Sequence, residues 1–128
     1  HENLPVATEN GSGFICFSPL AQGLLTDRYL HGIPAGSRAT KEVFLHKAQI
    51  TEQVLARTRA LNEIAQQRGQ SLSQMALAWL LSHEGVTSVI IGASSVAQLD
   101  NNLQAINRLS FSQDELQVLR NTLATYAD

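Results

Sequence analysis

Two short segments of the sequence carry residues suited to binding a nucleotide-like ligand. The first, residues 17–25, reads Phe-Ser-Pro-Leu-Ala-Gln-Gly-Leu-Leu and begins at the end of the apolar run 14–17. The ring of Phe17 can stack on a planar ring, while the Ser18 hydroxyl and the amides after Pro19 can donate hydrogen bonds to phosphate oxygens. The alternative is an ordinary strand-to-turn transition with Phe17 in the core, since aromatic side chains are usually buried for packing.

The second segment, residues 92–95, reads Gly-Ala-Ser-Ser and follows the apolar run 86–91. Gly92 allows a ligand to approach the backbone closely, and the start of a helix offers free amides and the positive end of its dipole to an anion. In the alternative interpretation Ser95 only caps the helix and Gln98 closes its capping box. Both interpretations can hold together, because a capped helix start still presents amides.

A third feature is the pair Arg28 and Arg38, which lie in the Gly- and Pro-containing stretch 20–47. A guanidinium offers planar, bidentate donors that suit phosphate, and long irregular loops are commonly functional. The commoner fate of an arginine is a solvated surface position.

The remaining reactive side chains form no pattern that indicates chemistry. The four histidines are far apart in the sequence and form no cluster with the spacing of metal ligands, so we expect no metal site. Cys16 is the single cysteine and lies in an apolar run, which favours a small core residue and excludes an intrachain disulfide. Ser18 lacks the G-x-S-x-G pattern of a nucleophile elbow, which argues against a hydrolase.

Strands and helices must position these residues. The run 14–17 does not alternate and is bounded by turn residues, which is typical of a strand buried on both faces, and the run 86–91 predicts a second strand. Four helices are predicted from their start signals, namely Thr51 (ending near Gly69) and the capping-box pairs Ser71/Gln74, Ser95/Gln98 and Ser112/Glu115. Met75 and Trp79 are interpreted as core residues.

Composition bounds the class of protein. The 128 residues are 44% hydrophobic and 16% charged, with a formal net charge of −2, which predicts a core but no nucleic-acid partner. No apolar run reaches the ~18 residues that span a bilayer. The first residues do not resemble a signal peptide, so we expect no membrane association and a cytoplasmic location.

The order of elements reads as the end of a repeating β/α architecture. Two parallel strands alone would leave their edges and their second face uncovered. We therefore expect the chain to belong to something larger or to complete its sheet with another copy.

Several motifs together resemble the C-terminal part of the aldo-keto reductases, closest to the branch of the bacterial glyceraldehyde-3-phosphate reductases and the potassium-channel β subunits. The resemblance covers residues 13–128, with residues 1–12 as a tail or the truncated end of a preceding helix. It rests on the segments 17–30, 32–34 and 37–38, and on 89–94 continued by Gln98, Leu99 and Asn102. It implies an α/β fold, namely the C-terminal part of a (β/α)8 barrel with strands seven and eight at 14–17 and 87–91, incomplete as a barrel on its own.

The resemblance further implies that this part of the chain binds NADP, as NADPH. Phe17 matches the aromatic residue that stacks on the nicotinamide, and the loop after it lies along the ribose and pyrophosphate. The implied cofactor-binding residues are Phe17, Ser18, Pro19, Leu20, Ala21, Gln22, Arg28, Arg38, Gly92, Ala93, Ser94, Gln98, Asn101 and Asn102.

One of these positions departs from the family pattern. Asn101 stands where a glutamate is usual beside the adenine, but an amide can still accept a hydrogen bond from the adenine amino group. Gly36 also stands where some relatives have tyrosine, which removes one stacking contact.

The implied activity of the full-length protein is NADPH-dependent reduction of small aldehydes and ketones, phosphorylated ones such as glyceraldehyde 3-phosphate included. The family's catalytic tyrosine, lysine, aspartate and histidine have no counterpart here, so we expect the chain alone to be inactive. The main alternative is a non-catalytic, oligomeric NADP-binding subunit. A helical interaction module is a third, which no motif supports. We expect a homo-oligomer or association with the missing half of the barrel.

Overall fold

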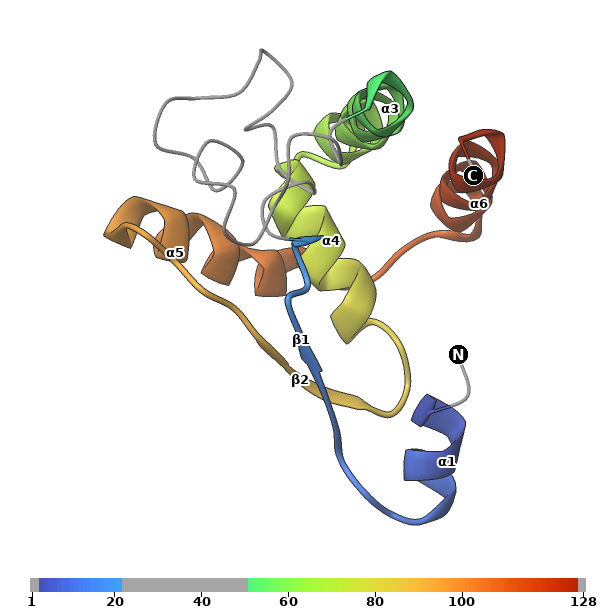
Figure 1. The fold of residues 1–128 in the computed structure, drawn as a ribbon, viewed down its shortest axis with the longest axis vertical. Coiled ribbons are helices and arrows are strands. Elements are labelled where there is room, and N and C mark those ends of the chain that lie inside the picture. The colour runs from blue at the N-terminus through green and yellow to red at the C-terminus, as the bar shows by residue number, and fades with distance from the viewer. Residues whose placement is uncertain (1–2, 22–50, 127–128) are drawn as a thin grey trace.

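The computed structural model describes residues 3–21 and 51–126 of the chain. Along the described chain, a helix comes before each of the two strands and further helices follow each strand (Figure 1). The elements are α1 (Asn3–Glu9), β1 (Phe14–Phe17), α3 (Glu52–Gln67), α4 (Leu72–Leu81), β2 (Val86–Ile90), α5 (Val96–Leu103), the 3-10 helix η4 (Gln104–Arg108) and α6 (Gln113–Thr125).

The two predicted strands are confirmed, and they pair in parallel. Phe14 lies opposite Val86 and Phe17 opposite Ile90, with a register shift directly after Phe14. Thr87, within the shifted stretch, accepts a hydrogen bond from the Phe14 amide through its hydroxyl oxygen at 3.1 Å. Parallel pairing requires a long crossover, which α3 and α4 help to supply.

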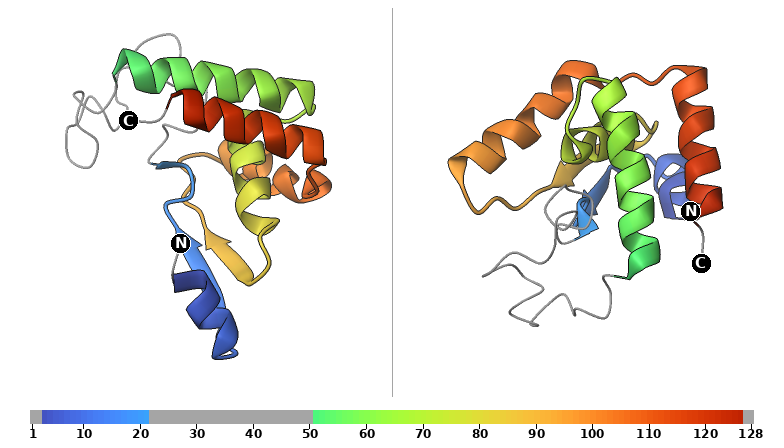
Figure 2. Two further views of the ribbon diagram at one scale, coloured as in Figure 1. Left: turned by 90° about the vertical axis from the view of Figure 1, so that its right-hand side faces the viewer. Right: turned by 90° about the horizontal axis from the view of Figure 1, so that it is seen from above.

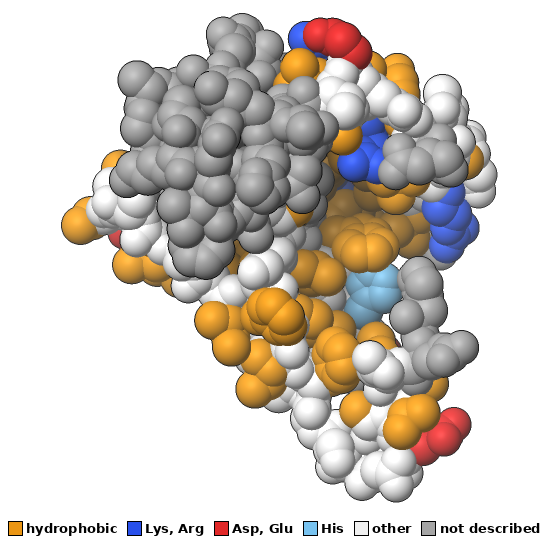
Figure 3. Space-filling view, viewed as in Figure 1, with side chains coloured by type: hydrophobic (Ala, Val, Ile, Leu, Met, Phe, Trp, Pro, Cys, Tyr) orange, Lys and Arg blue, Asp and Glu red, His pale blue; other side chains and the backbone are white. Residues whose placement is uncertain are grey.

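The prediction that residues 14–17 are buried on both faces is wrong for the described residues. Phe14 and Cys16 are half-buried, whereas Ile15 and Phe17 are 57% and 80% exposed. In the described chain β1 has one neighbouring strand, and α4 packs on the sheet from one side only. Hydrophobic side chains therefore gather at the surface over the two strands (Figure 3).

Helix starts and ends follow the sequence signals closely. Thr51 caps α3 by accepting a hydrogen bond from the Val54 amide, and Gly69 follows the helix with a φ of +71°, a conformation that favours glycine. Ser71 with Gln74 and Ser112 with Glu115 form complete capping boxes at the starts of α4 and α6. These predictions are confirmed because caps depend on residues only three positions apart.

The core lies where α3, α4 and α6 meet. Helices α3 and α6 run side by side, and α4 lies between them and the sheet (Figure 2). Met75 is buried, as predicted, while Trp79 is only half-buried and packs against the edge of the cluster. The buried cluster consists of Leu61, Ile64, Ala65, Leu72, Met75 and Leu119.

A buried ion pair joins the end of α3 to the start of α6. The Arg68 side chain is 1% exposed, donates to Glu115 Oε2 at 2.6 Å and stacks over the Phe111 ring with its guanidinium carbon 3.7 Å from the ring centroid. It also donates to the carbonyl oxygens of Arg108 and Ser110. Each buried donor thus has a partner, which is the condition for burying a charge.

This environment shifts the pKa of both groups. Burial lowers the pKa of the Arg68 guanidinium, and the neighbouring Glu115 carboxylate opposes that change. Burial acts to raise the pKa of the Glu115 carboxyl, but the Ser112 amide, Arg68 and Arg108 outweigh it, so this pKa lies below its ordinary value. Glu115 therefore stabilises the fold as the carboxylate.

Residues 1–12, expected to be a tail or the end of a helix, contain α1 at the amino ends of the strands. Gly85, with a φ of +90°, faces this helix so closely that a Cβ there would lie 2.6 Å from the Thr8 hydroxyl oxygen. Across residues 3–21 and 51–126, no helix is both long and apolar enough to cross a membrane.

Candidate functional site

The loops that follow β1 and β2 begin at the same end of the sheet, where both strands have their carboxyl ends. Phe17 and Ile90 end the strands opposite each other, so residues 18–21 and 91–95 begin side by side. In open α/β folds, ligands bind at the carboxyl ends of parallel strands. The sheet therefore brings the first two sequence-predicted segments together.

The loop after β1 has an unusual backbone. Ser18 and Ala21 have φ values of +52° and +47°, and the Ala21 amide donates to the Ser18 carbonyl oxygen at 3.1 Å. Residues other than glycine in this conformation are uncommon, and such strain concentrates at ligand sites. Phe17 lies exposed beside this turn, so the alternative that places its ring in a core is wrong for the described residues.

The start of α5 differs from its prediction. Ser95 caps the helix by accepting a hydrogen bond from the Gln98 amide at 3.1 Å. Gln98 Oε1 instead accepts from the Ser94 amide at 2.7 Å and the Ser94 hydroxyl at 3.0 Å. The predicted capping box is thus only half formed, because the Gln98 side chain reaches one residue beyond the cap and fastens the loop to the helix.

Anion-binding capacity remains at this helix start. The amides of Val96 and Ala97 lie in the first turn, where no carbonyl four residues earlier is available within the helix. A Cβ on Gly92 would meet nothing within 4 Å, so the backbone there is open to a ligand. The anion site at residues 92–95 stays a prediction, for which these amides and the open backbone at Gly92 leave room.

Helix α5 exposes its apolar side chains and turns polar ones toward the protein, the opposite of a helix that packs on a core. Val96 and Leu103 are 76% and 52% exposed, and Leu99 and Ile106 also lie at the surface. The buried side carries Asn102 and Ala105, with Gln98 and Asn101 half-buried. Residues 98, 101, 102 and 105 share one helical face, which places three amide side chains in a row.

Asn101 is held by the start of α4. Its Nδ2 donates to the hydroxyl oxygens of Ser71 and Ser73 at 3.2 and 3.1 Å. Its Oδ1 and its backbone oxygen accept from Gln74 Nε2 at 3.0 and 2.8 Å. Sequence reasoning assigned Ser71 and Gln74 to capping alone and omitted Ser73. The signal available was a cluster of three polar residues opening an otherwise apolar helix.

Asn102 is 3% exposed, and its Nδ2 has no hydrogen-bond partner among the described residues. An unpaired buried donor costs about 1–3 kcal/mol, so such groups usually mark a missing partner. Among the described residues, Asn102 therefore has a buried donor with unused hydrogen-bonding capacity.

The other predicted site residues stand as follows. Pro19 and Leu20 are half-buried in the β1 loop, and Ala93 is exposed after β2. Gln22, Arg28 and Arg38 lie outside the described residues. Within the described parts of the chain, no three or more His, Cys, Asp or Glu side chains gather where they could hold a metal ion.

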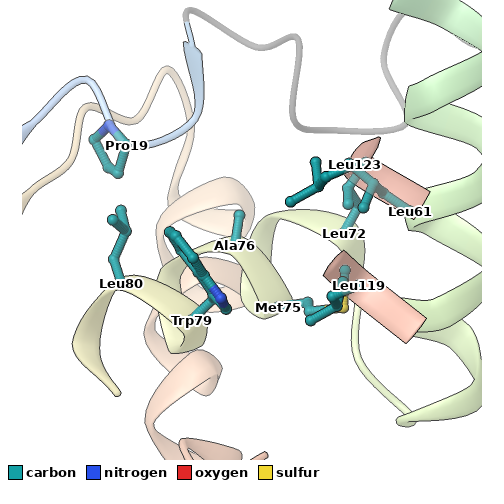
Figure 4. Close-up of a pocket in the computed structure, with 9 residues that line it drawn as sticks. All are labelled: Pro19, Leu61, Leu72, Met75, Ala76, Trp79, Leu80, Leu119 and Leu123. Atoms are coloured by element: carbon teal, nitrogen blue, oxygen red, sulfur yellow. The ribbon is translucent and has the colours of Figure 1, made fainter. Parts of the chain in front are cut away.

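A separate pocket of about 200 Å³ lies between the β1 loop and helices α3, α4 and α6 (Figure 4). Its lining includes Pro19, Leu61, Trp79, Leu80 and Leu123, and no lining residue is titratable. Such a pocket offers no acid, base or nucleophile. The chemistry-bearing groups lie at the strand ends instead.

Comparison with known proteins finds relatives over most of the chain. L-glyceraldehyde 3-phosphate reductase of Escherichia coli K12 is 54% identical over 117 residues, which cover 88% of this chain and 34% of that protein. A probable voltage-gated potassium channel subunit beta of Arabidopsis thaliana is 38% identical over 109 residues, which cover 83% of this chain and 33% of that protein.

The chain thus spans about a third of the length of the curated relatives that it matches. The sequence profile of the Aldo/keto reductase family matches residues 1–123, so the match includes the first twelve residues that the motif resemblance left out. With strands, strand-end loops and sequence in agreement, the chain belongs to the aldo/keto reductase family.

Proposed function

We propose that the chain is the cofactor-binding, C-terminal part of a (β/α)8 barrel in an NADPH-dependent reductase of small aldehydes and ketones. Phosphorylated aldehydes of the glyceraldehyde 3-phosphate type are the proposed substrate class, supported by the name of the 54% identical relatives. The observation that carries the proposal is the pair of parallel strands whose ends present Phe17, a strained loop and the open start of α5.

The open face of the sheet supports the barrel. In a (β/α)8 barrel, helices cover the outside of the strands and side chains fill the interior. Here α4 packs on one face, while Ile15, Phe17 and Ile90 are exposed on the other. We assign β1 and β2 to strands seven and eight, with the exposed face toward the barrel interior.

The same exposed surfaces bear on assembly. Exposed strand faces and the apolar stripe of α5 are surfaces that soluble proteins normally cover. We propose that the rest of the barrel covers them in the full-length protein. A homo-oligomer and a cytoplasmic location are further parts of this proposal.

The described residues fit an NADPH molecule. Phe17 offers an exposed ring for the nicotinamide, and Gly92 leaves the backbone open for a phosphate. The Asn102 amide is a buried donor without a partner among the described residues, as expected of a group that a purine would satisfy. Ser18, Pro19, Leu20, Ala21, Ala93, Ser94, Gln98 and Asn101 would complete the described part of the site, joined by Gln22, Arg28 and Arg38.

When bound, NADPH supplies the hydride for reduction of the carbonyl group. The role of this chain would be to hold the cofactor, with Phe17 against the nicotinamide ring and residues 18–21 along the ribose and pyrophosphate. No residue of the chain is assigned to proton donation. We therefore propose that residues 1–128 alone do not reduce aldehydes.

Preference for NADPH over NADH would arise at the start of α5. The 2′-phosphate adds nearly two negative charges, and the first-turn amides with the Ser95 hydroxyl supply donors. The amide and hydroxyl of Ser94, which donate to Gln98 Oε1 in this structure, would turn to the phosphate when it binds. Residues 92–99 contain no Asp or Glu to repel it, and also no Lys or Arg. A few neutral donors to a charged group favour NADPH by about 1–3 kcal/mol.

Fluorescence titration of the full-length protein with NADPH and NADH tests this proposal. Ser94→Glu places a carboxylate at the phosphate position and should remove the NADPH preference. Gln113→Glu makes the same charge change in the first turn of α6 and should leave the preference intact. Tighter binding of NADH than NADPH by the unmodified protein, or an unchanged preference in Ser94→Glu, would contradict the assignment.

A second candidate function is a non-catalytic NADP-binding subunit, favoured by the 38% identity to proteins named potassium channel β subunits. An assay of aldehyde reduction distinguishes the enzyme from the non-catalytic subunit. Reduction of glyceraldehyde 3-phosphate by the full-length protein supports the enzyme. NADPH binding without turnover of any aldehyde supports the subunit.

A further inference from the structure

A cluster of hydrogen bonds joins α4 to α5 and holds the side-chain amide of Asn101 in one orientation. Its Nδ2 donates to the hydroxyl oxygens of Ser71 and Ser73, which lie 3.1 Å from each other on the same side of that nitrogen. Its Oδ1 accepts one hydrogen bond, from Gln74 Nε2, and retains a second lone pair. The amide nitrogen of Asn101 is therefore engaged by the start of α4, and Oδ1 keeps the capacity to accept a further hydrogen bond.

Gln74 fixes this orientation of the Asn101 amide. Its Oε1 accepts from the Ser71 amide at 2.9 Å, which closes the capping box and forces its Nε2 toward α5. That Nε2 donates to both Asn101 oxygens, so the reversed amide would bring two N–H groups against each other. Gln74 and Ser73 are 8% and 6% exposed, which limits replacement of these bonds by water.

We propose that Gln74 and Ser73 are positioning residues that make Asn101 an obligate acceptor for the 6-amino group of adenine. The inference rests on the proposed NADPH function. It explains how an amide at this position performs the task of an acceptor-only carboxylate. The neighbouring Asn102 contributes the complementary donor, since its Nδ2 has no partner among the described residues. One acceptor and one donor match the amino group and an adjacent ring nitrogen of adenine.

The test compares NADPH with its hypoxanthine analogue, in which an oxygen acceptor replaces the 6-amino donor. The ratio of the two dissociation constants, measured by fluorescence titration of the full-length protein, reports the hydrogen-bond direction at the base. The two ligands carry the same charge, so a variant's effect on charge or overall fold cancels in this ratio. The unmodified protein should favour NADPH by about tenfold, the effect of one hydrogen bond gained and one repulsion avoided.

Gln74→Glu is the decisive variant. A glutamate keeps the capping box but replaces the Nε2 donors with an acceptor, which favours the reversed Asn101 amide and directs an N–H toward the base. The tenfold ratio should fall to about one or invert. Ser73→Ala frees one Asn101 N–H and should lower the ratio partially. Ser82→Ala, which removes a serine hydroxyl at the other end of α4, should leave it unchanged.

Substitutions of Asn101 keep the test decisive if an α4 variant fails to fold. Asn101→Glu retains an acceptor and should preserve the preference, whereas Asn101→Leu should abolish it. An unmodified protein that binds both dinucleotides equally overturns the inference while the NADPH function stands. So does a ratio that a folded Gln74→Glu variant leaves unchanged, or one that Asn101→Leu leaves unchanged. An unmodified protein that binds neither dinucleotide overturns the proposed function itself.

Discussion

The molecule has two regions, one formed by α3, α4 and α6 and the other by β1, β2 and α5. They differ in how completely their apolar side chains are buried and their polar groups are paired. In the helical region Ala65 and Ala78 are fully buried, and a buried ion pair joins Arg68 to Glu115. In the other region Phe17 and Val96 are 80% and 76% exposed. The first region holds the buried core of the described chain, and the second holds the proposed cofactor site.

This contrast follows from what each region must contact. The helices α3, α4 and α6 bury their apolar side chains against one another. Strand ends and a helix start must leave groups unpaired if a ligand is to bind them. The open region is therefore where substitutions should change binding more than stability.

The largest expected effect is loss of a core side chain in the helical region. Leu72→Ala removes a 2% exposed side chain between α3, α4 and α6, and should lower the free energy of unfolding by about 3 kcal/mol. Phe17→Ala, at an 80% exposed position, should change it by less than about 0.5 kcal/mol in the 128-residue chain. Urea unfolding monitored by circular dichroism measures both changes. Equal losses of unfolding free energy in the two variants would contradict the proposed difference between the regions.

A second substitution tests whether the open surface is covered in the full-length protein. Leu103→Ala should alter the stability of residues 1–128 by less than about 0.5 kcal/mol, because the side chain is 52% exposed. In the full-length protein the same change should cost about 2 kcal/mol, since the rest of the barrel would bury it. Parallel urea titrations of the two lengths make the measurement. A negligible loss in both would argue against the barrel.

The ion pair predicts a pH dependence. Because the folded-state pKa of Glu115 is lowered, its stabilisation is present above the unfolded-state pKa of about 4.3 and is lost as the pH falls through the lower folded value. Glu115→Gln should cost about 1–2 kcal/mol at pH 7, and the difference should vanish in acid.

Urea unfolding midpoints of the unmodified protein and of Glu115→Gln, measured at pH 7, 5, 4 and 3, test whether the stability difference disappears in acid. Asp114→Asn is the matched control, since it makes the same charge change in the same helical turn without an arginine partner among the hydrogen bonds and ion pairs of the described residues. A Glu115→Gln deficit that persists unchanged at pH 3 would contradict the assigned role.

The smallest expected effect concerns helix capping. Ser112→Ala should cost about 1 kcal/mol, because it opens the complete box at the start of α6. Ser95→Ala should cost about 0.5 kcal/mol, because α5 has only half a box and contributes little to the core. Thermal melting of the two variants side by side compares the regions. A larger loss for Ser95→Ala would reverse the expected order.

The sequence alone determined the local features of this protein. Both strands, the caps at Thr51, Ser71 and Ser112, and the glycine after α3 followed from residues within a few positions of one another. The family resemblance was equally readable, because its motifs are short and contiguous. Local signals survive in any tertiary context that preserves the element.

Only the tertiary structure decided where side chains point and which distant groups meet. The run 14–17 resembled a fully buried strand, yet burial depends on neighbouring elements, and in the described chain one face stays open. The meeting of Gln74 with Asn101, 27 residues apart, required α4 and α5 to pack. Hydrogen-bond direction within an amide cluster depends on geometry between helices, and no spacing along a single helix encodes it.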